Sequence, residues 1–420
     1  MRSPIKEINK LRSSNLARNA SWMMIGQGGN LLLQAVYFAL LGRLLGSVQY
    51  GVFVGAFALT SLLATFSAMG SGTLLIRYVS TEHGRFAAYW GNVLITTTTV
   101  SAALIAGSTL IAPHVLNPAS ASLVLLAGIA NCFCSEVTRN AAAVFQTFEK
   151  MKITAALNSF TGFSRVCAAA GMFVVLHHAT AFQWAVATLA VSALAASASA
   201  ITVTARYGWP TFSASLMVKK IPEGFSYSFA SSTASVYNDI DKTMLSHYGM
   251  NAANGIYALA YRVIDVATIP MAAVRDAAVP RFFRDGSNDR QGLKNLTKRL
   301  TKRALVVTLL LAGVLYATAP LIPLVVGKSF AETVQAVRWL CFIPVLRSIH
   351  QMSGSAVMGM GKQNYRTASQ LVVALVNLGL NLFWIPAYGW RGAAWSSLLS
   401  DALLAGCNWT LLLHLCRRRG

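Results

Sequence analysis

Twelve long apolar segments, separated by short polar gaps, constrain this chain of 420 residues more than any other feature. The hydrocarbon core of a bilayer is about 30 Å thick, and a helix needs about 20 apolar residues to cross it. Inside a bilayer every backbone group has to be paired within the protein, so we expect each segment to be a helix. The predicted spans are 19–42, 50–76, 87–112, 120–145, 153–177, 181–205, 223–247, 254–279, 304–327, 332–358, 365–386 and 392–415.

The basic residues fall almost entirely in every second gap between these spans. Of the 35 Lys and Arg residues, 25 lie in the two termini and the even-numbered gaps, counting Arg366 at the edge of its span with the gap, and seven lie deeper inside the spans. Only Arg43, Lys328 and Arg391 lie in the odd-numbered gaps. Short loops rich in Lys and Arg stay on the cytoplasmic side of a membrane. The sequence therefore predicts an inner-membrane protein with both termini in the cytoplasm.

Composition excludes several other classes of protein. The net charge of +22 is spread over membrane-flanking stretches, so we expect contact with anionic lipid headgroups and no binding of nucleic acid. We find no P-loop, Rossmann fingerprint or nucleophile elbow, and we expect no cofactor and no enzymatic activity. The six cysteines lie in or beside apolar segments without a complementary set of ligands, so we predict no metal site.

The chain also contains an internal repeat. Gly51–Val–Phe53 follows the first predicted outer turn, and Gly255–Ile–Tyr257 follows the corresponding turn six spans later. An even number of spans separates the copies, so both have the same orientation in the membrane, as in transporters built from parallel repeats. We expect two six-helix lobes and alternating access to a site near the midplane. The expected parts are a basic tail (1–18), an N-lobe (19–205), a cytoplasmic linker (206–222), a C-lobe (223–415) and a second basic tail (416–420).

Polar residues recur at steps of three or four on several spans, which places them on one face of each helix. Asn30 and Gln34 form such a stripe on the first span, and Asn238, Asp239 and Lys242 form another on the seventh. The stripes predict a hydrated cavity between the lobes; the alternative is interhelical hydrogen bonding that only holds the bundle together. The side chains expected to line the cavity are Asn30, Gln34, Arg139, Arg165, Asn238, Lys242, Arg262 and Arg347.

Arg165 and Arg347 are the strongest candidates for contact with a substrate. Both lie near mid-depth, and neither has an acidic residue three or four positions away. A mid-membrane arginine needs an anionic ligand or a counter-ion on another helix, and its planar fork suits phosphate oxygens. The alternative for both arginines is a cross-helix pair with Asp401 or Asp265.

The remaining intramembrane charges have two interpretations. Glu136 and Arg139 are three residues apart, as are Arg262 and Asp265, and each pair is either an intrahelical ion pair or part of the cavity. Carboxylates within spans are also candidates for binding a coupling ion. These candidates are Glu136, Asp239, Asp265 and Asp401.

Three stretches resemble the Wzx-type polysaccharide flippases of the multidrug/oligosaccharidyl-lipid/polysaccharide (MOP) exporter superfamily. They are LGRLLGSVQYGVF at 41–53, NDIDKTMLS at 238–246 and GIYALAYR at 255–262. The resemblance implies an all-α, MATE-like fold in a bacterial inner membrane. It also implies transfer of oligosaccharides linked to undecaprenyl pyrophosphate to the outer leaflet, for O-antigen, capsule or exopolysaccharide synthesis. A polysaccharide polymerase and a chain-length regulator are the partners that it suggests.

A second hypothesis is an ion-coupled multidrug antiporter of the MATE type. In that case Asp239 or Asp265 would carry the coupled cation or proton. Apart from the first two residues at either end of each span, the spans hold seven basic and six acidic residues, so charge alone does not select an anionic substrate. A membrane-embedded enzyme that modifies sugars is a third and weaker alternative.

Overall fold

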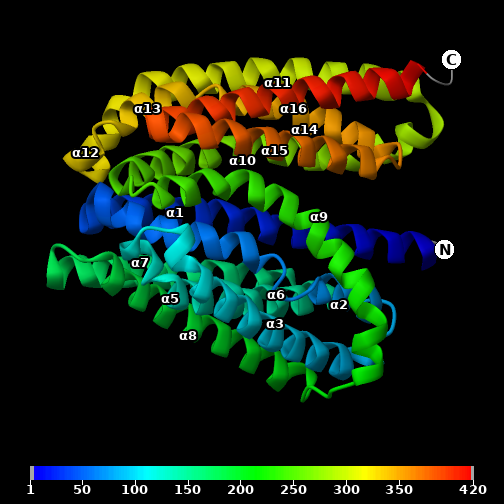
Figure 1. Cartoon of the computed structure of the whole chain (residues 1–420). Coiled ribbons are helices and arrows are strands. Elements are labelled where there is room, and N and C mark those ends of the chain that lie inside the picture. The colour runs from blue at the N-terminus through cyan, green and yellow to red at the C-terminus, as the bar shows by residue number, and fades with distance from the viewer. Residues whose placement is uncertain (1–3, 418–420) are drawn as a thin grey trace. The chain divides into compact units, whose positions relative to one another are not determined.

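The computed structural model describes residues 4–417. It describes side chains from residue 28 onward, except those of residues 31, 230, 231, 233–238, 270, 273, 277, 280, 287 and 288. Within these limits all regular structure is helical (Figure 1). The chain divides into two compact units, which are described separately. The first unit comprises residues 1–45, 59–114 and 118–232, and the second comprises 46–58, 115–117 and 233–420.

The first unit contains most of α1 and the helices up to the beginning of α9. A left-handed backbone conformation at Gly46 (φ 65°) divides α1 (Pro4–Ala64) into two helical segments. The other elements of this unit are α2 (Ser71–Val79), a 3-10 turn (His83–Arg85), α3 (Phe86–Val115), α4 (Pro118–Ala121), α5 (Val124–Gly128), a π-helical turn (Ile129–Ser135), α6 (Glu136–Thr147), α7 (Met151–Leu176), α8 (Ala181–Tyr207) and the first part of α9 (Ala214–His247). Leu75, Trp90, Phe145 and Val203 form its core, where α2, α3, α6 and α8 meet.

The second unit contains residues 46–58 of α1, the part of α9 from residue 233 onward, and the helices that follow α9. Its elements are α10 (Asn251–Asn288), α11 (Arg290–Thr318), α12 (Ile322–Val326), α13 (Thr333–Leu340), α14 (Ile343–Gly359), α15 (Gln363–Tyr388) and α16 (Trp390–Arg417), with 3-10 turns at Ala319–Leu321 and Lys328–Phe330. The long helices α11, α14, α15 and α16 run side by side (Figure 1). Tyr257, Ile264, Val337 and Leu340 are buried in its core.

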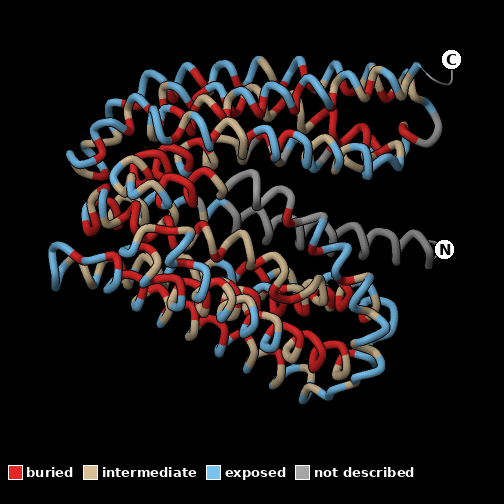
Figure 2. Tube along the Cα trace, viewed as in Figure 1, coloured by how far each residue is buried: buried red, intermediate tan, exposed pale blue. Residues whose placement is uncertain are grey.

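Large apolar side chains cover the outer sides of several helices. Leu310 on α11 and Phe383 on α15 are 68% and 78% exposed, while buried residues follow the sides on which helices of the same unit pack (Figure 2). Such a surface is stable in lipid and costly in water. The protein is therefore a multi-pass membrane protein, as the sequence predicts.

Seven of the described helical segments are long and apolar enough to cross a membrane. They are Gly28–Ala64, His83–Val115, Met151–Leu176, Ala181–Tyr207, Arg290–Val326, Gln363–Tyr388 and Trp390–Arg417. Each of the twelve predicted spans lies largely on helix, although turns at 65–70, 122–123 and 341–342 interrupt three of them. The all-helical membrane class is confirmed, and the count of twelve spans stays a prediction.

The two glycines that align in the internal repeat pack against each other in the second unit. A Cβ on Gly51 would lie 1.7 Å from the backbone oxygen of Asn251, and a Cβ on Gly255 would lie 2.0 Å from that of Ser47. Each glycine therefore lies against the backbone carbonyl of the residue four positions before the other glycine. This reciprocity is what a two-fold relation between repeated segments produces. The aligned glycines allow two helical segments to touch through their backbones.

Candidate functional site

The second unit gathers charged and hydroxyl side chains from four helices, named here the second-unit polar cluster. Helical periodicity brings them together, because residues three or four positions apart share a helix face. Its members are Asp239, Asp241 and Lys242 of α9, Tyr257, Tyr261, Arg262 and Asp265 of α10, Arg347 and His350 of α14, and Ser397 and Asp401 of α16.

Arg347 occupies the centre of this cluster and bridges two carboxylates. Its Nη1 lies 2.9 Å from Oδ1 of Asp265, and its Nε lies 3.8 Å from Oδ2 of Asp401. Asp401 is completely buried, whereas the side chain of Asp265 is 45% exposed. The structure therefore has the cross-helix pairing that the sequence offered as the alternative to substrate contact. The guanidinium also lies 5.7 Å from the ring centroid of Tyr261.

His350 extends the same group of charges. Its Nε2 lies 3.2 Å from Oδ1 of Asp401. His350 follows Arg347 by three residues, so one face of α14 presents both side chains to Asp401 of α16.

Asp241 is a cluster member that was not among the predicted site residues, and the same holds for Tyr257, Tyr261, His350 and Ser397. The Tyr257 hydroxyl donates a hydrogen bond to its carboxylate, and the backbone N–H of Lys242 donates another (2.7 Å). The Tyr257 hydroxyl also lies 2.9 Å from Oγ of Ser397. Residues two positions apart on a helix point to different sides, so Asp241 does not lie on the helix face that carries Asp239 and Lys242. Asp241 does lie in the stretch 238–246, which carries the resemblance to the flippase family.

Lys242 and Arg262 complete the set of cations. Lys242 is buried, and its Nζ lies 2.8 Å from Oδ1 of Asp239 on the same helix. Arg262 lies within hydrogen-bonding reach of the Tyr50 hydroxyl, and its charge acts on Lys242. The structure pairs Asp265, its predicted partner, with Arg347. The side chain of Asn238 lies outside the described residues.

The first unit holds the other predicted residues. Glu136 and Arg139 form the intrahelical ion pair that the sequence offered as one interpretation, with 2.8 Å between Nη1 and Oε1. Arg165 on α7 has a buried Nε without a hydrogen-bond partner within the described residues. Asn30 Oδ1 lies 2.8 Å from where a Cβ on Gly162 would be, so α1 and α7 approach closely. Gln34 is half-buried on α1.

The second-unit polar cluster contains one more acidic group than it has permanent cations. Asp239, Asp241, Asp265 and Asp401 face Lys242, Arg262 and Arg347. Leaving an uncompensated charge in a membrane helix bundle is costly. One further proton, on His350 or on a carboxylate, makes the set neutral.

Comparison with known proteins places the chain in a family. The model of the family described as "Polysaccharide biosynthesis protein" matches residues 16–285. The chain belongs to that family. One curated relative is the "Probable low-salt glycan biosynthesis flippase Agl15" of Haloferax volcanii, which is 24% identical over 212 residues. The alignment covers 48% of this chain and 45% of that relative, less than half of either protein.

Solved structures of two kinds share the fold of this family member. An inward-facing multidrug resistance transporter of the MATE family in the MOP superfamily matches with a TM-score of 0.74, at 14% identity over 92% of this chain and 94% of that one. The lipid II flippase MurJ, in an inward closed conformation, matches with a TM-score of 0.73, at 13% identity over 93% and 87%. At these identities the likeness establishes the fold. The MATE-like fold is confirmed, and so is the resemblance to Wzx-type flippases.

Proposed function

We propose that this protein is a flippase for lipid-linked oligosaccharides. The family match across residues 16–285, in a chain with the fold of MOP transporters, carries the proposal. Its substrate would be an oligosaccharide on undecaprenyl pyrophosphate, moved from the cytoplasmic to the outer leaflet of a bacterial inner membrane. A polymerase and a chain-length regulator would then act on the product. The alternation of basic gaps supports cytoplasmic termini, and the chain would move its substrate without chemical change.

Arg165 is the side chain best suited to bind the pyrophosphate. It lies midway along α7, and its buried Nε has no acceptor within the described residues. A guanidinium N–H that is left without an acceptor in a buried place gains strongly from a phosphate oxygen. Arg347 is the weaker candidate, because Asp265 and Asp401 already offset its charge.

The second-unit polar cluster would supply the coupling between an ion gradient and transport. Its four carboxylates exceed its three permanent cations by one, so one bound proton would make the cluster neutral. The buried Asp401–His350 pair would bind that proton. Imidazole changes its charge near physiological pH, which suits proton binding better than sodium binding. Protonation would change the net charge around Arg347. The cluster would therefore have two states, one with a net negative charge and one that is neutral.

Surface glycan display tests the flippase proposal. A strain that lacks the gene would carry the wild type, Arg165→Ala or Arg347→Ala, with membrane expression of each measured. Arg85→Ala is the matched control, since Arg85 is exposed and pairs with Glu82. We expect Arg165→Ala to abolish display and to accumulate lipid-linked repeat units in the inner leaflet, with Arg85→Ala unchanged. Normal display in the deletion strain, together with altered efflux of cationic dyes, would instead support the multidrug antiporter.

A further inference from the structure

Four basic residues lie together on the exposed side of α11, in its N-terminal half. They are Lys298, Arg299, Lys302 and Arg303, named here the α11 basic face. The opposite side of the helix is buried and carries small side chains such as those of Thr297, Thr301 and Ala304. Residues three or four positions apart share one side of a helix, so the four cations form a continuous surface.

No carboxylate of the described residues neutralises the α11 basic face. α11 contains no Asp or Glu, and none of the four side chains forms an ion pair or a hydrogen bond with a described residue. Asp289 is the acidic residue nearest to them in the sequence, and it accepts a hydrogen bond from the backbone N–H of Gly292 at 2.7 Å. Four positive charges within two turns of helix therefore lack a counter-ion in this part of the chain.

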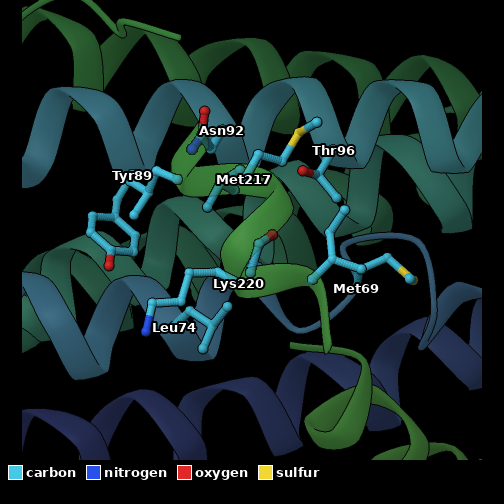
Figure 3. Close-up of a pocket in the computed structure, with 11 residues that line it drawn as sticks. Met69, Leu74, Tyr89, Asn92, Thr96, Met217 and Lys220 are labelled. Atoms are coloured by element: carbon cyan, nitrogen blue, oxygen red, sulfur yellow. The ribbon is translucent and has the colours of Figure 1, made fainter. Parts of the chain in front are cut away.

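Basic residues elsewhere in the chain show the contrast. Lys220 lies beside a small pocket between α2, α3 and the first turns of α9 (Figure 3), and its Nζ lies 3.0 Å from an oxygen of Glu223. Arg284 of α10 pairs with Asp285, with 3.2 Å between Nε and Oδ1. A neighbouring carboxylate reduces the attraction of such a cation for a further anion. The α11 basic face keeps its full attraction.

The height of the α11 basic face along the helix corresponds to the level of lipid headgroups. The helical segment Arg290–Val326 has 37 residues and is about 55 Å long, whereas the hydrocarbon core is about 30 Å thick. Val306 and Leu310 continue the same side of α11 with apolar surface and are 56% and 68% exposed. With Val306 at the edge of the core, the segment crosses the core up to its C-terminal end, and Arg303 and Lys298 lie about 5 and 12 Å outside it. Long basic side chains at this height reach the phosphate layer.

We propose that the α11 basic face is a binding site for the headgroups of anionic phospholipids. Phosphate oxygens would accept hydrogen bonds from the guanidinium groups of Arg299 and Arg303, and the two lysines would add positive charge. Acyl chains would lie against Val306 and Leu310. The sequence predicts contact of every basic gap with lipid, whereas the structure selects this one helix face as a site. The proposal does not depend on the flippase function, since α11 contributes no residue to the second-unit polar cluster.

Local lipid selectivity of the full chain tests this assignment. A photo-crosslinking amino acid would replace Val306, and the protein would be placed in vesicles with equal amounts of phosphatidylcholine and phosphatidylglycerol. Lipids attached after illumination would be identified by mass spectrometry. We expect an excess of attached phosphatidylglycerol of about fivefold, which should decrease at high salt because salt screens exposed charges.

Two quadruple variants with the same loss of charge separate the site from the net charge of the protein. In the first, which removes the α11 basic face, we expect equal attachment of both lipids; it combines Lys298→Gln, Arg299→Gln, Lys302→Gln and Arg303→Gln. In the second, which removes four exposed cations from separate places, we expect the excess to remain; it combines Arg206→Gln, Lys219→Gln, Arg281→Gln and Lys362→Gln. Thermal unfolding would check the folding of both.

Three results would overturn the proposal. The first is equal attachment of both lipids in the protein that keeps all its cations. The second is an equal loss of the excess in both quadruple variants, which would assign the effect to net charge. The third is displacement of the attached phosphatidylglycerol by undecaprenyl pyrophosphate at a much lower concentration. That result would assign the α11 basic face to a polyprenyl carrier.

Discussion

Single atoms decide the packing of α1 against α10 in the second unit. The hydrogen of Gly51 leaves room for the carbonyl of Asn251, and the hydrogen of Gly255 leaves room for that of Ser47. Asn254 Nδ2 also donates a hydrogen bond to the carbonyl of Gly51 (3.1 Å). Contacts between backbones have no side-chain rotamer that could move aside.

Gly51→Ala should therefore destabilise the protein strongly. The added methyl would lie 1.7 Å from the Asn251 oxygen, and we expect a loss of at least about 2 kcal/mol in unfolding free energy. Gly107→Ala on α3 is the control, because a Cβ there meets nothing within 4 Å. Thermal unfolding in detergent would compare the two. Equal melting temperatures would show that the close approach does not hold.

Arg347 allows a second prediction at this scale. Arg347→Met leaves the buried Asp401 without its guanidinium, which should cost about 3–5 kcal/mol. Adding Asp401→Asn should restore part of that loss, since both charges are then absent. Arg284→Met, at an exposed arginine beside Asp285, should change stability by less than about 0.5 kcal/mol. Additive losses in the double variant would contradict the pairing.

At the scale of elements, α9 is attached to the first unit through its N-terminal turns. Gly224 approaches the backbone of Met69 and Gly70 so closely that a Cβ would lie 2.2 Å from the Met69 oxygen. Glu223 accepts hydrogen bonds from Tyr78 (2.9 Å), Lys220 (3.0 Å) and Arg77 (2.8 Å). Backbone contact and ion pairs together fix this end of α9 on α2.

The attachment should weaken at alkaline pH. Hydrogen bonds to Tyr78 and Glu223 raise the pKa of Lys220 above its usual 10.5. A raised lysine pKa stabilises the folded state fully below the unfolded value, and the contribution disappears as pH rises through the folded value. We expect wild type to lose its stability advantage over Lys220→Met only above pH 10.5. Thermal unfolding across the pH range measures this, and an advantage that persists unchanged would contradict it.

At the scale of the whole molecule, the proposed function needs an energy source. The second-unit polar cluster is neutral when it holds one proton, so we expect flipping of a lipid-linked oligosaccharide in proteoliposomes to stop when the proton gradient is collapsed. Removal of sodium should have no effect. Asp401→Asn should abolish the response to the gradient while the protein remains folded. Transport that follows sodium instead would reject proton coupling and leave the family assignment intact.

The sequence by itself determined the class of the protein. Hydropathy fixes which segments prefer lipid, and the alternation of basic gaps predicts their orientation, because both depend on local composition. The cost of a charge inside a membrane also singled out Asp265, Arg347 and Asp401 as candidates for a functional role. The resemblance at 41–53, 238–246 and 255–262 indicated the family that the comparison confirmed. The internal repeat aligned Gly51 with Gly255, and the structure shows that these two glycines are in contact.

Only the tertiary structure decided which polar groups meet. Arg347 pairs with Asp265, 82 residues away, and Asp241 is buried against Tyr257 of the next helix. Residues 46–58 of α1, which begin at Gly46, belong to the second unit, although the residues on either side of them in the chain belong to the first. Such partners depend on the rotation and crossing of whole helices, which small differences in packing set. The periodicity of one helix does not show which other helix packs against it. The sequence therefore predicted which helix faces are polar, and the tertiary structure determined which polar side chains pair with one another.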